Sequence, residues 1–297
     1  MFTFSLPFTN IVYNMSSNSS IIGYYQVEPK ERAYFFIKVV VTALIVIGYI
    51  SAFILQANIG GIVIAAFAIL FIWLITLFYA GLMKGLIKNS SVRISEQQLP
   101  EIYSIVQSYS SHLNLKRVPA VYLMQAGGQL NAFATRIHGR NYVILFSDLL
   151  EEFYQGNEET VRFVIAHELG HIKQGHLIKR SLTFPSLIVP FLNNAYSRAC
   201  EYTCDNIGAF FSQQGAVKGI TTLAAGKVIN SHINHRSLIE QSYHDGGFWC
   251  WFVEKLSTHP VLSKRLKRVY KEAPRKVVST PVEEKKSENN HEAYMPK

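Results

Sequence analysis

Two long apolar runs without a charged side chain set the strongest limit on how this chain can fold. The first covers residues 39–56 (VVVTALIVIGYISAFILQ), and the second covers residues 62–80 (IVIAAFAILFIWLITLFYA), after a short break at residues 57–61. Each run approaches the roughly 20 residues that a helix needs to cross about 30 Å of hydrocarbon. A buried hairpin in a soluble core is the alternative, but two such runs in tandem favour a transmembrane helical hairpin.

Composition and charge agree with contact between this protein and lipid. Hydrophobic residues make up 49% of the chain and charged residues only 16%, which is a low charged fraction for a soluble globular protein. The net charge of +9 is spread along the chain and is not gathered into one basic run. We therefore expect a lipid bilayer as a partner and no nucleic acid.

The positions of the cations predict the orientation of the hairpin. Cationic residues flank its two outer ends, and none lies between the spans: Lys30, Arg32, Lys38, Lys84, Lys88 and Arg93. The positive-inside bias predicts that both flanks, and the domain that follows, are cytoplasmic. The chain has three cysteines, Cys200, Cys204 and Cys250. That number predicts no disulfide framework, in agreement with a reducing compartment.

Changes in composition divide the chain into four parts. We predict a polar N-terminal extension at residues 1–33, the hairpin at 34–81, a folded domain at 82–273 and a disordered tail at 274–297, which is rich in Lys, Glu, Ser, Asn and Pro. Within the domain, apolar periodicity predicts helices at 96–113, 158–179 and 195–211 and β-strands at 120–124 and 142–146. The predicted fold class is α+β: a transmembrane hairpin followed by a mainly helical domain with a small β-sheet.

The sequence His167-Glu168-Leu169-Gly170-His171 is an HExxH motif. Two histidines four residues apart lie on one face of a helix, so that both imidazoles can bind one zinc ion. Glu168 lies beside the metal, where it can take a proton from bound water. The residues before the motif are mostly apolar and compatible with a helix, as a buried active-site helix requires. Two unrelated surface histidines would not need that setting.

A catalytic zinc ion needs a third protein ligand and an open position for water. A continuing helix would carry His176 about 140° off the face of His167 and His171. Glu201 is the better candidate, and Asp205, one helical turn later, could accept the outer N–H of a ligating histidine. Solvated surface acids are the alternative for this pair. Cys200 and Cys204 lie beside Glu201, but packing explains them better, because hydrolytic zinc sites usually take nitrogen and oxygen ligands.

Four motifs together resemble the HtpX-type membrane zinc metallopeptidases, relatives of the CAAX prenyl protease. They are Asn131 to Arg136 (NAFATR), His167 to His171, Glu201 to Asp205 (ExxxD), and Thr258-His259-Pro260 followed by Arg265. The resemblance covers about residues 98–270, with the motifs in the family's order. It implies a zincin-like protease domain with one zinc ion per chain, Glu201 as the third ligand, and a substrate cleft flanked by Asn131, Ala132 and Phe133.

The sequence departs from that pattern at two internal positions. Cys204 stands where the family usually has alanine, which leaves a thiol near the metal. Only 29 residues separate His171 from Glu201, too few for the two further spans that some members carry there. The apolar stretch at residues 182–192 contains two prolines, so we interpret it as a lip of the cleft or an interfacial segment.

The resulting hypothesis is a zinc-dependent endopeptidase with Glu168 as general base, acting on polypeptides, including misfolded membrane proteins, in protein quality control. His259 could stabilise the oxyanion, although a histidine that caps the loop before Pro260 is an equal alternative. The strand at 142–146, taken as a sheet edge, could align an extended peptide. A selective processing protease and a catalytically silent zinc-binding membrane scaffold are the rival hypotheses.

Overall fold

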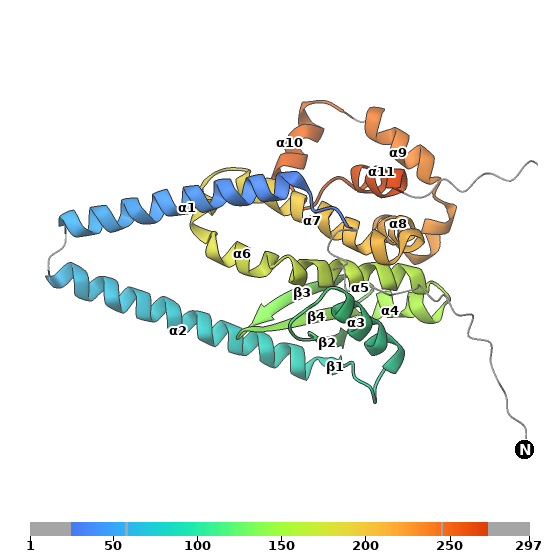
Figure 1. Cartoon of the computed structure of the whole chain (residues 1–297), viewed down its shortest axis with the longest axis horizontal. Helices are drawn as coiled ribbons and strands as arrows, with labels where there is room; N and C mark the ends of the chain where they lie inside the picture. The colour runs from blue at the N-terminus through green and yellow to red at the C-terminus, as the bar shows by residue number, and fades with distance from the viewer. Residues whose placement is uncertain (1–24, 57–58, 245, 273–297) are drawn as a thin grey trace, which may run out of the picture.

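A computed structural model describes residues 25–56, 59–244 and 246–272. Two long helices, α1 (Pro29–Gln56) and α2 (Ile59–Asn89), project together from the body of the molecule (Figure 1). Both are long and apolar enough to span a membrane, and at most 6% of either apolar window is buried. They enclose the predicted spans at 39–56 and 62–80 and continue beyond them into the body. The hairpin therefore cannot be the core of a soluble domain.

A small β-sheet forms the floor of the folded domain. Its strands are β1 (Ser91–Arg93), β2 (Ala120–Met124), β3 (Ala132–Ile137) and β4 (Arg140–Phe146), in the order β1-β2-β4-β3. Only β2 and β4 are parallel, and the other two pairs are antiparallel.

The prediction that residues 142–146 form an edge strand is wrong, because β4 lies between β2 and β3. Its last five residues are all buried, as expected of a central strand. A tight turn at His138 and Gly139, both with positive φ, folds β3 back onto β4. The edge strands are thus β1 and β3, and the sequence predicted neither of them as a strand.

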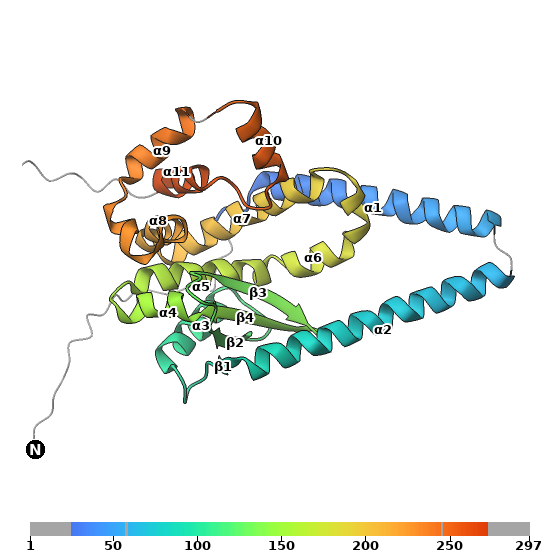
Figure 2. The same ribbon diagram turned by 180° about the vertical axis from the view of Figure 1, so that it is seen from behind.

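Helices cover this sheet and surround the centre of the domain (Figure 2). In chain order they are α3 (Pro100–His112), α4 (Ser147–Tyr154), α5 (Glu158–Lys173), α6 (His176–Leu182), η2 (Phe184–Ile188), α7 (Leu192–Phe211), α8 (Gln213–Ile229), η3 (Asn230–His232), α9 (His235–His244), α10 (Phe248–Leu256) and α11 (Leu262–Glu272). The predicted α+β fold class is confirmed. The predicted helices at 96–113 and 195–211 correspond to α3 and α7.

Helix α5 is the central element of the domain. Nearly every residue from Thr160 to Gly170 is buried, and α5 packs against β3, α7 and α8. Gly208 allows α7 to approach closely, because a Cβ there would lie 2.6 Å from ring atoms of Phe163. This close approach brings the side chains of α7 within reach of those of α5.

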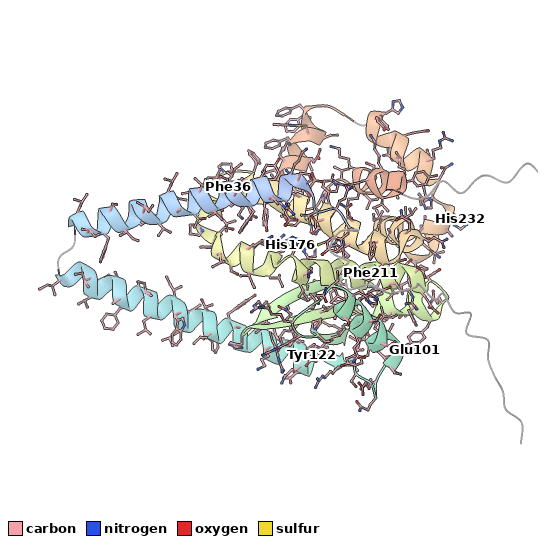
Figure 3. All side chains as sticks on the ribbon, viewed as in Figure 1. Phe36, Glu101, Tyr122, His176, Phe211 and His232 are labelled. Carbon is pink, nitrogen blue, oxygen red and sulfur yellow. The ribbon has the colours of Figure 1, made fainter. Side chains whose placement is uncertain are left out.

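The prediction of one continuous helix at residues 158–179 is wrong, because the helix is interrupted at Gly175. This glycine has φ 67°, a left-handed conformation that favours glycine, and α6 starts at the next residue. The break turns His176 inward, and Figure 3 shows it between α6 and the layer formed by α1 and α7. Residues 182–192 form the short η2 and the turns around it, beside α1.

Two predicted parts lie wholly or mainly outside the described residues. These are the tail at 274–297 and most of the N-terminal extension at 1–33. The last residues of that extension already belong to the first turn of α1, where Glu31 is buried.

Candidate metal centre

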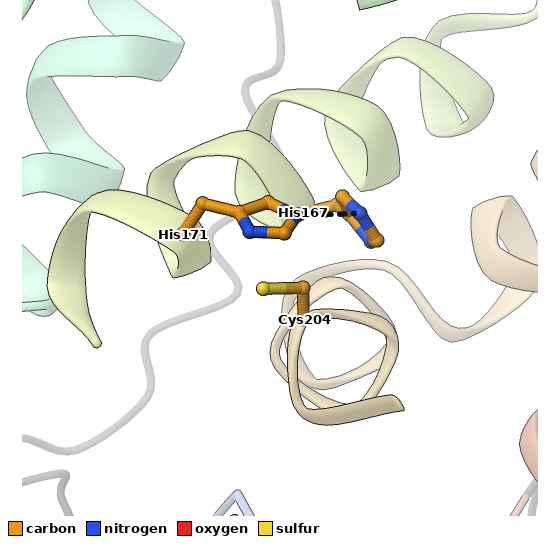
Figure 4. Close-up of side chains that lie close together, drawn as sticks. All are labelled: His167, His171 and Cys204. Atoms are coloured by element: carbon orange, nitrogen blue, oxygen red, sulfur yellow. Dashed lines mark hydrogen bonds between the residues drawn. The ribbon is translucent and has the colours of Figure 1, made fainter. Parts of the chain in front are cut away.

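The HExxH residues lie in the last two turns of α5. Glu158 and Glu159 occupy the first turn of this helix, where carboxylates stabilise the positive end of the helix dipole. His167 and His171 project from one face, and their Nε2 atoms are 3.3 Å apart (Figure 4). Helical spacing alone thus brings the two imidazoles together.

Helix α7 brings Glu201 to the same point. Glu201 Oε2 lies 3.5 Å from Nε2 of His167, and Glu201 Oε1 lies 3.5 Å from Nε2 of His171. The three side chains are between 6% and 14% exposed. Two imidazole nitrogens and a carboxylate therefore converge in a nearly buried space.

The spacing of these three groups fits a metal ion, and zinc in particular. Ligand atoms about 2.0–2.1 Å from a tetrahedral zinc ion lie about 3.3–3.4 Å from one another. The contacts of 3.3, 3.5 and 3.5 Å are close to that spacing. An ion held by His167, His171 and Glu201 would satisfy both facing nitrogens, and all three residues line the cleft.

Cys204 is a rival ligand, since its Sγ and one nitrogen of each histidine all lie within 4.8 Å of one another (Figure 4). However, burial raises the pKa of the Cys204 thiol well above its usual range. Binding of a metal through Cys204 would therefore have to displace the proton of a thiol that holds it strongly. The carboxylate of Glu201 has a pKa that contacts with His167 lower against the effect of burial, and its two oxygens each face one of the imidazoles, so Glu201 is the candidate third ligand.

The protonation of the two histidines differs because their partners differ. Burial opposes a charge on His167, but contacts with Asp205 and Glu201 raise its pKa to about 10. Burial lowers the pKa of His171 to about 3. Without a metal, His167 is thus the positively charged group of the site, between the carboxylates of Asp205 and Glu201.

Asp205 holds the outer side of His167. Its Oδ1 lies 3.1 Å from Nδ1 of His167, the arrangement expected for the outer partner of a ligating histidine. Arg265 of α11 donates two hydrogen bonds to the same carboxylate, at 2.8 and 2.6 Å. From the sequence, Arg265 was predictable only as part of a motif, because the contact between Arg265 and Asp205 depends on the packing of α11 against α7.

Glu168 lies next to the two histidines and is buried. Burial raises its pKa to about 7, and a hydrogen bond from the backbone of Ala134 opposes that rise. Glu168 and Ala134 of β3 both line the cleft. This is a suitable setting for a group that takes up and releases a proton.

His259 reaches the same site from the loop between α10 and α11. Its Nε2 lies 3.8 Å from Oε1 of Glu201, and its side chain is 66% exposed. Its backbone N–H donates to Ser257 Oγ at 3.2 Å. The position is thus compatible with both predicted roles, as an oxyanion donor and as part of the loop before Pro260.

A cleft of about 270 Å³ opens over the site. Its walls include the predicted substrate residues Asn131, Ala132 and Phe133, together with Ala134, Phe163, Val164, His167, Glu168, His171, Leu177, Arg180, Ser197, Glu201, Leu223, Thr258, His259 and Arg265. The structure therefore gathers every candidate residue around one cleft except Asp205, which lies behind His167.

Comparison with known proteins decides the family. The model of peptidase family M48 matches residues 96–189 and 181–273, more than half of the chain. The chain belongs to peptidase family M48. Its resemblance to the HtpX-type metallopeptidases is confirmed by two proteins described as "Protease HtpX homolog". The one from Streptococcus gordonii is 30% identical over 145 residues, 48% of this chain and 47% of its own length. The one from Syntrophobacter fumaroxidans is 37% identical over 89 residues, 30% of each chain.

Two further similarities are more distant. The plastoglobule-localized metallopeptidase 48 of Arabidopsis thaliana chloroplasts is 26% identical over 172 residues, 52% of this chain and 49% of its own length. The crystal structure of S. mikatae Ste24p aligns with a TM-score of 0.46 and 13% identity, covering 84% of this chain and 68% of Ste24p. The matched segment is about half the length of the curated relatives or less.

Proposed function

We propose that this M48 family member is a zinc-dependent endopeptidase that hydrolyses polypeptides at a membrane. The observation that carries the proposal is the convergence of His167, His171 and Glu201 at zinc-ligand spacing, with Glu168 beside them at the floor of a cleft. Three protein ligands with an open fourth position are typical of catalytic zinc, whereas structural zinc sites are closed by four.

Glu168 is the proposed general base. A zinc ion held by His167, His171 and Glu201 would supply Lewis-acid polarisation of the scissile carbonyl and an acidified water. Glu168 takes the proton from the attacking water in the cleft and passes it to the leaving amine. His259 is placed to donate a hydrogen bond to the carbonyl oxygen as negative charge develops on it.

The outer edge of β3 is the proposed substrate platform. Beyond its pairing with β4, this strand has no further neighbour in the described sheet, and Ala132, Phe133 and Ala134 line the cleft. An extended peptide that adds to this edge would place a backbone carbonyl near Glu168, because the same strand contacts that carboxylate through Ala134. Backbone pairing of this kind selects extended chains more than particular side chains.

Membrane insertion of α1 and α2 is the second part of the proposal. Their exposed apolar side chains, such as Leu44, Phe67 and Trp73, would cover about 30 Å of hydrocarbon. The cations at both outer ends support a cytoplasmic peptidase domain. An unfolded or membrane-derived polypeptide reaching the cleft beside α1 would be the substrate, in agreement with a role in protein quality control.

Two rival functions make different demands on the site. A catalytically silent zinc-binding scaffold has no use for Glu168, a buried carboxylate kept at the cleft. A selective processing protease, such as one that cuts prenylated peptides, would need a more enclosed cleft. Only two candidate spans are found in the described part of the chain.

The test is hydrolysis by the purified full-length chain in detergent micelles. Protein stripped with a chelator should not cut an unfolded protein substrate, and one equivalent of zinc should restore cleavage at many sites. No hydrolysis by the zinc-loaded protein would contradict the peptidase proposal. Cleavage of a prenylated peptide, with unfolded protein left intact, would favour the processing protease.

A further inference from the structure

The side of His171 that faces away from the metal site leads into a buried chain of polar contacts. Nδ1 of His171 lies 3.0 Å from Nδ1 of His176, and Nε2 of His176 lies 3.0 Å from Oε1 of Glu31. Glu31 lies in the first turn of α1. The chain of contacts thus joins the candidate metal centre to the start of the first apolar helix.

The donors and acceptors in this chain follow from the proposed zinc ligation. Zinc bound to Nε2 of His171 leaves the proton of the neutral ring on Nδ1, which therefore donates. Nδ1 of His176 must accept the hydrogen bond that Nδ1–H of His171 donates. The proton of neutral His176 is therefore on Nε2. That N–H donates to the carboxylate of Glu31. One direction of hydrogen bonding satisfies all three residues.

Burial and further contacts hold this chain in place. The side chains of His176 and Glu31 are each 1% exposed. Thr203 donates to Oε2 of Glu31 at 2.6 Å, and Lys179 donates to Oε1 at 3.2 Å. Both oxygens of Glu31 and both nitrogens of His176 therefore have partners, which fixes the plane of each group.

A second metal site is the competing interpretation of this cluster. Ligand atoms of Glu31, His176 and Cys200 all lie within 4.8 Å of one another. However, His176 has no nitrogen left for a metal, since His171 and Glu31 use both. A hydrogen-bonded chain is the better description.

We propose that Glu31 and His176 are positioning residues that fix the ring orientation and tautomer of the zinc ligand His171. The inference rests on the proposed zinc centre. Its consequence is that the metal centre is complete only when the first turn of α1 is seated against α6 and α7. Outer partners of a metal ligand typically change metal affinity by about 10–100-fold.

The first test compares two carboxylates at the start of α1. Glu31→Leu removes the acceptor from the chain, whereas Glu28→Leu removes a nearby buried carboxylate that pairs with Arg268 at 2.5 Å and does not contact His176. Glu31→Gln serves as rescue, because its amide oxygen can still accept from Nε2 of His176. The readouts are the zinc dissociation constant, by chelator competition, and the visible absorption of the cobalt-substituted protein.

Glu31→Leu should weaken zinc binding about 10–100-fold and shift the cobalt spectrum. Glu31→Gln should recover most of the affinity, and Glu28→Leu should change neither readout. Equal losses from Glu28→Leu and Glu31→Leu would overturn the proposal, because seating of α1 alone would then explain them. Unchanged binding in Glu31→Leu, or two zinc ions per wild-type chain, would also overturn it.

A measurement on the unsubstituted protein covers the case in which Glu31→Leu does not fold. Nitrogen-15 NMR of histidine-labelled, zinc-loaded protein should show His176 protonated at Nε2 and unprotonated at Nδ1. The opposite tautomer would overturn the proposed chain. None of these readouts requires hydrolysis. Zinc binding without peptidase activity would therefore contradict the proposed function and leave this inference intact.

Discussion

Gly175 separates α5 from α6, and its replacement by alanine has a calculable effect. Its φ of 67° lies in the left-handed region, and an added Cβ would meet no atom within 4 Å. The cost of Gly175→Ala is therefore conformational and not steric, about 1–2 kcal/mol. For a domain of this size that loss lowers Tm by about 2–8 °C.

The candidate metal centre should keep its geometry in the Gly175→Ala variant. Straightening the helix would pull His176 away from His171 and Glu31, and these buried contacts oppose it. Zinc affinity should thus stay unchanged while Tm falls.

The assay is thermal unfolding of the metal-free protein in micelles, with Gly156→Ala as the matched control. Gly156 has φ 88° and equally open surroundings, at the end of α4, so both variants should lose similar stability. Gly175→Asn should recover part of the loss, because asparagine tolerates the left-handed region. An unchanged or raised Tm in Gly175→Ala, beside a lowered Tm in Gly156→Ala, would refute the helix break and the position of His176 that depends on it.

Three further predictions concern the ligands and the membrane. Glu201→Ala should strip zinc from the purified protein, whereas Cys204→Ala should retain one zinc per chain by elemental analysis; the reverse result would replace Glu201 by the thiol. Asp205→Asn should weaken zinc binding about 10–100-fold, because the outer carboxylate of a ligating histidine is lost, and a chelator titration measures it. Reporters fused after Lys297 should show cytoplasmic fluorescence and no activity of a periplasmic phosphatase; active phosphatase would invert the proposed topology.

Local spacing made much of the site predictable from the sequence. His167 and His171 lie one helical turn apart, so the helix alone brings their nitrogens together. Glu201 and Asp205 are likewise one turn apart on α7. The sequence could therefore predict which side chains share one face of each helix. That α7 crosses α5 closely enough to join the two faces depends on tertiary packing, including the close approach at Gly208.

Residues whose positions depend on chain reversals or on long-range packing were not predictable from the sequence. His176 was set aside because the helix was expected to continue, although a glycine just before it, at position 175, is a common sign of a helix end. Glu31 is separated from His176 by 145 positions, and nothing in local periodicity links them. The same reasoning explains β4: its apolar run indicated a strand, but its central place in the sheet depends on the turn at His138 and Gly139.

Replacement of Glu168 by glutamine tests the central claim most directly. The amide matches the carboxylate in size but cannot take a proton from water, while His167, His171 and Glu201 are untouched. Glu168→Gln should therefore retain one zinc per chain and lose hydrolysis of an unfolded protein by at least about 10²-fold. A variant that keeps its zinc and cuts at a rate comparable with the wild type would contradict the account.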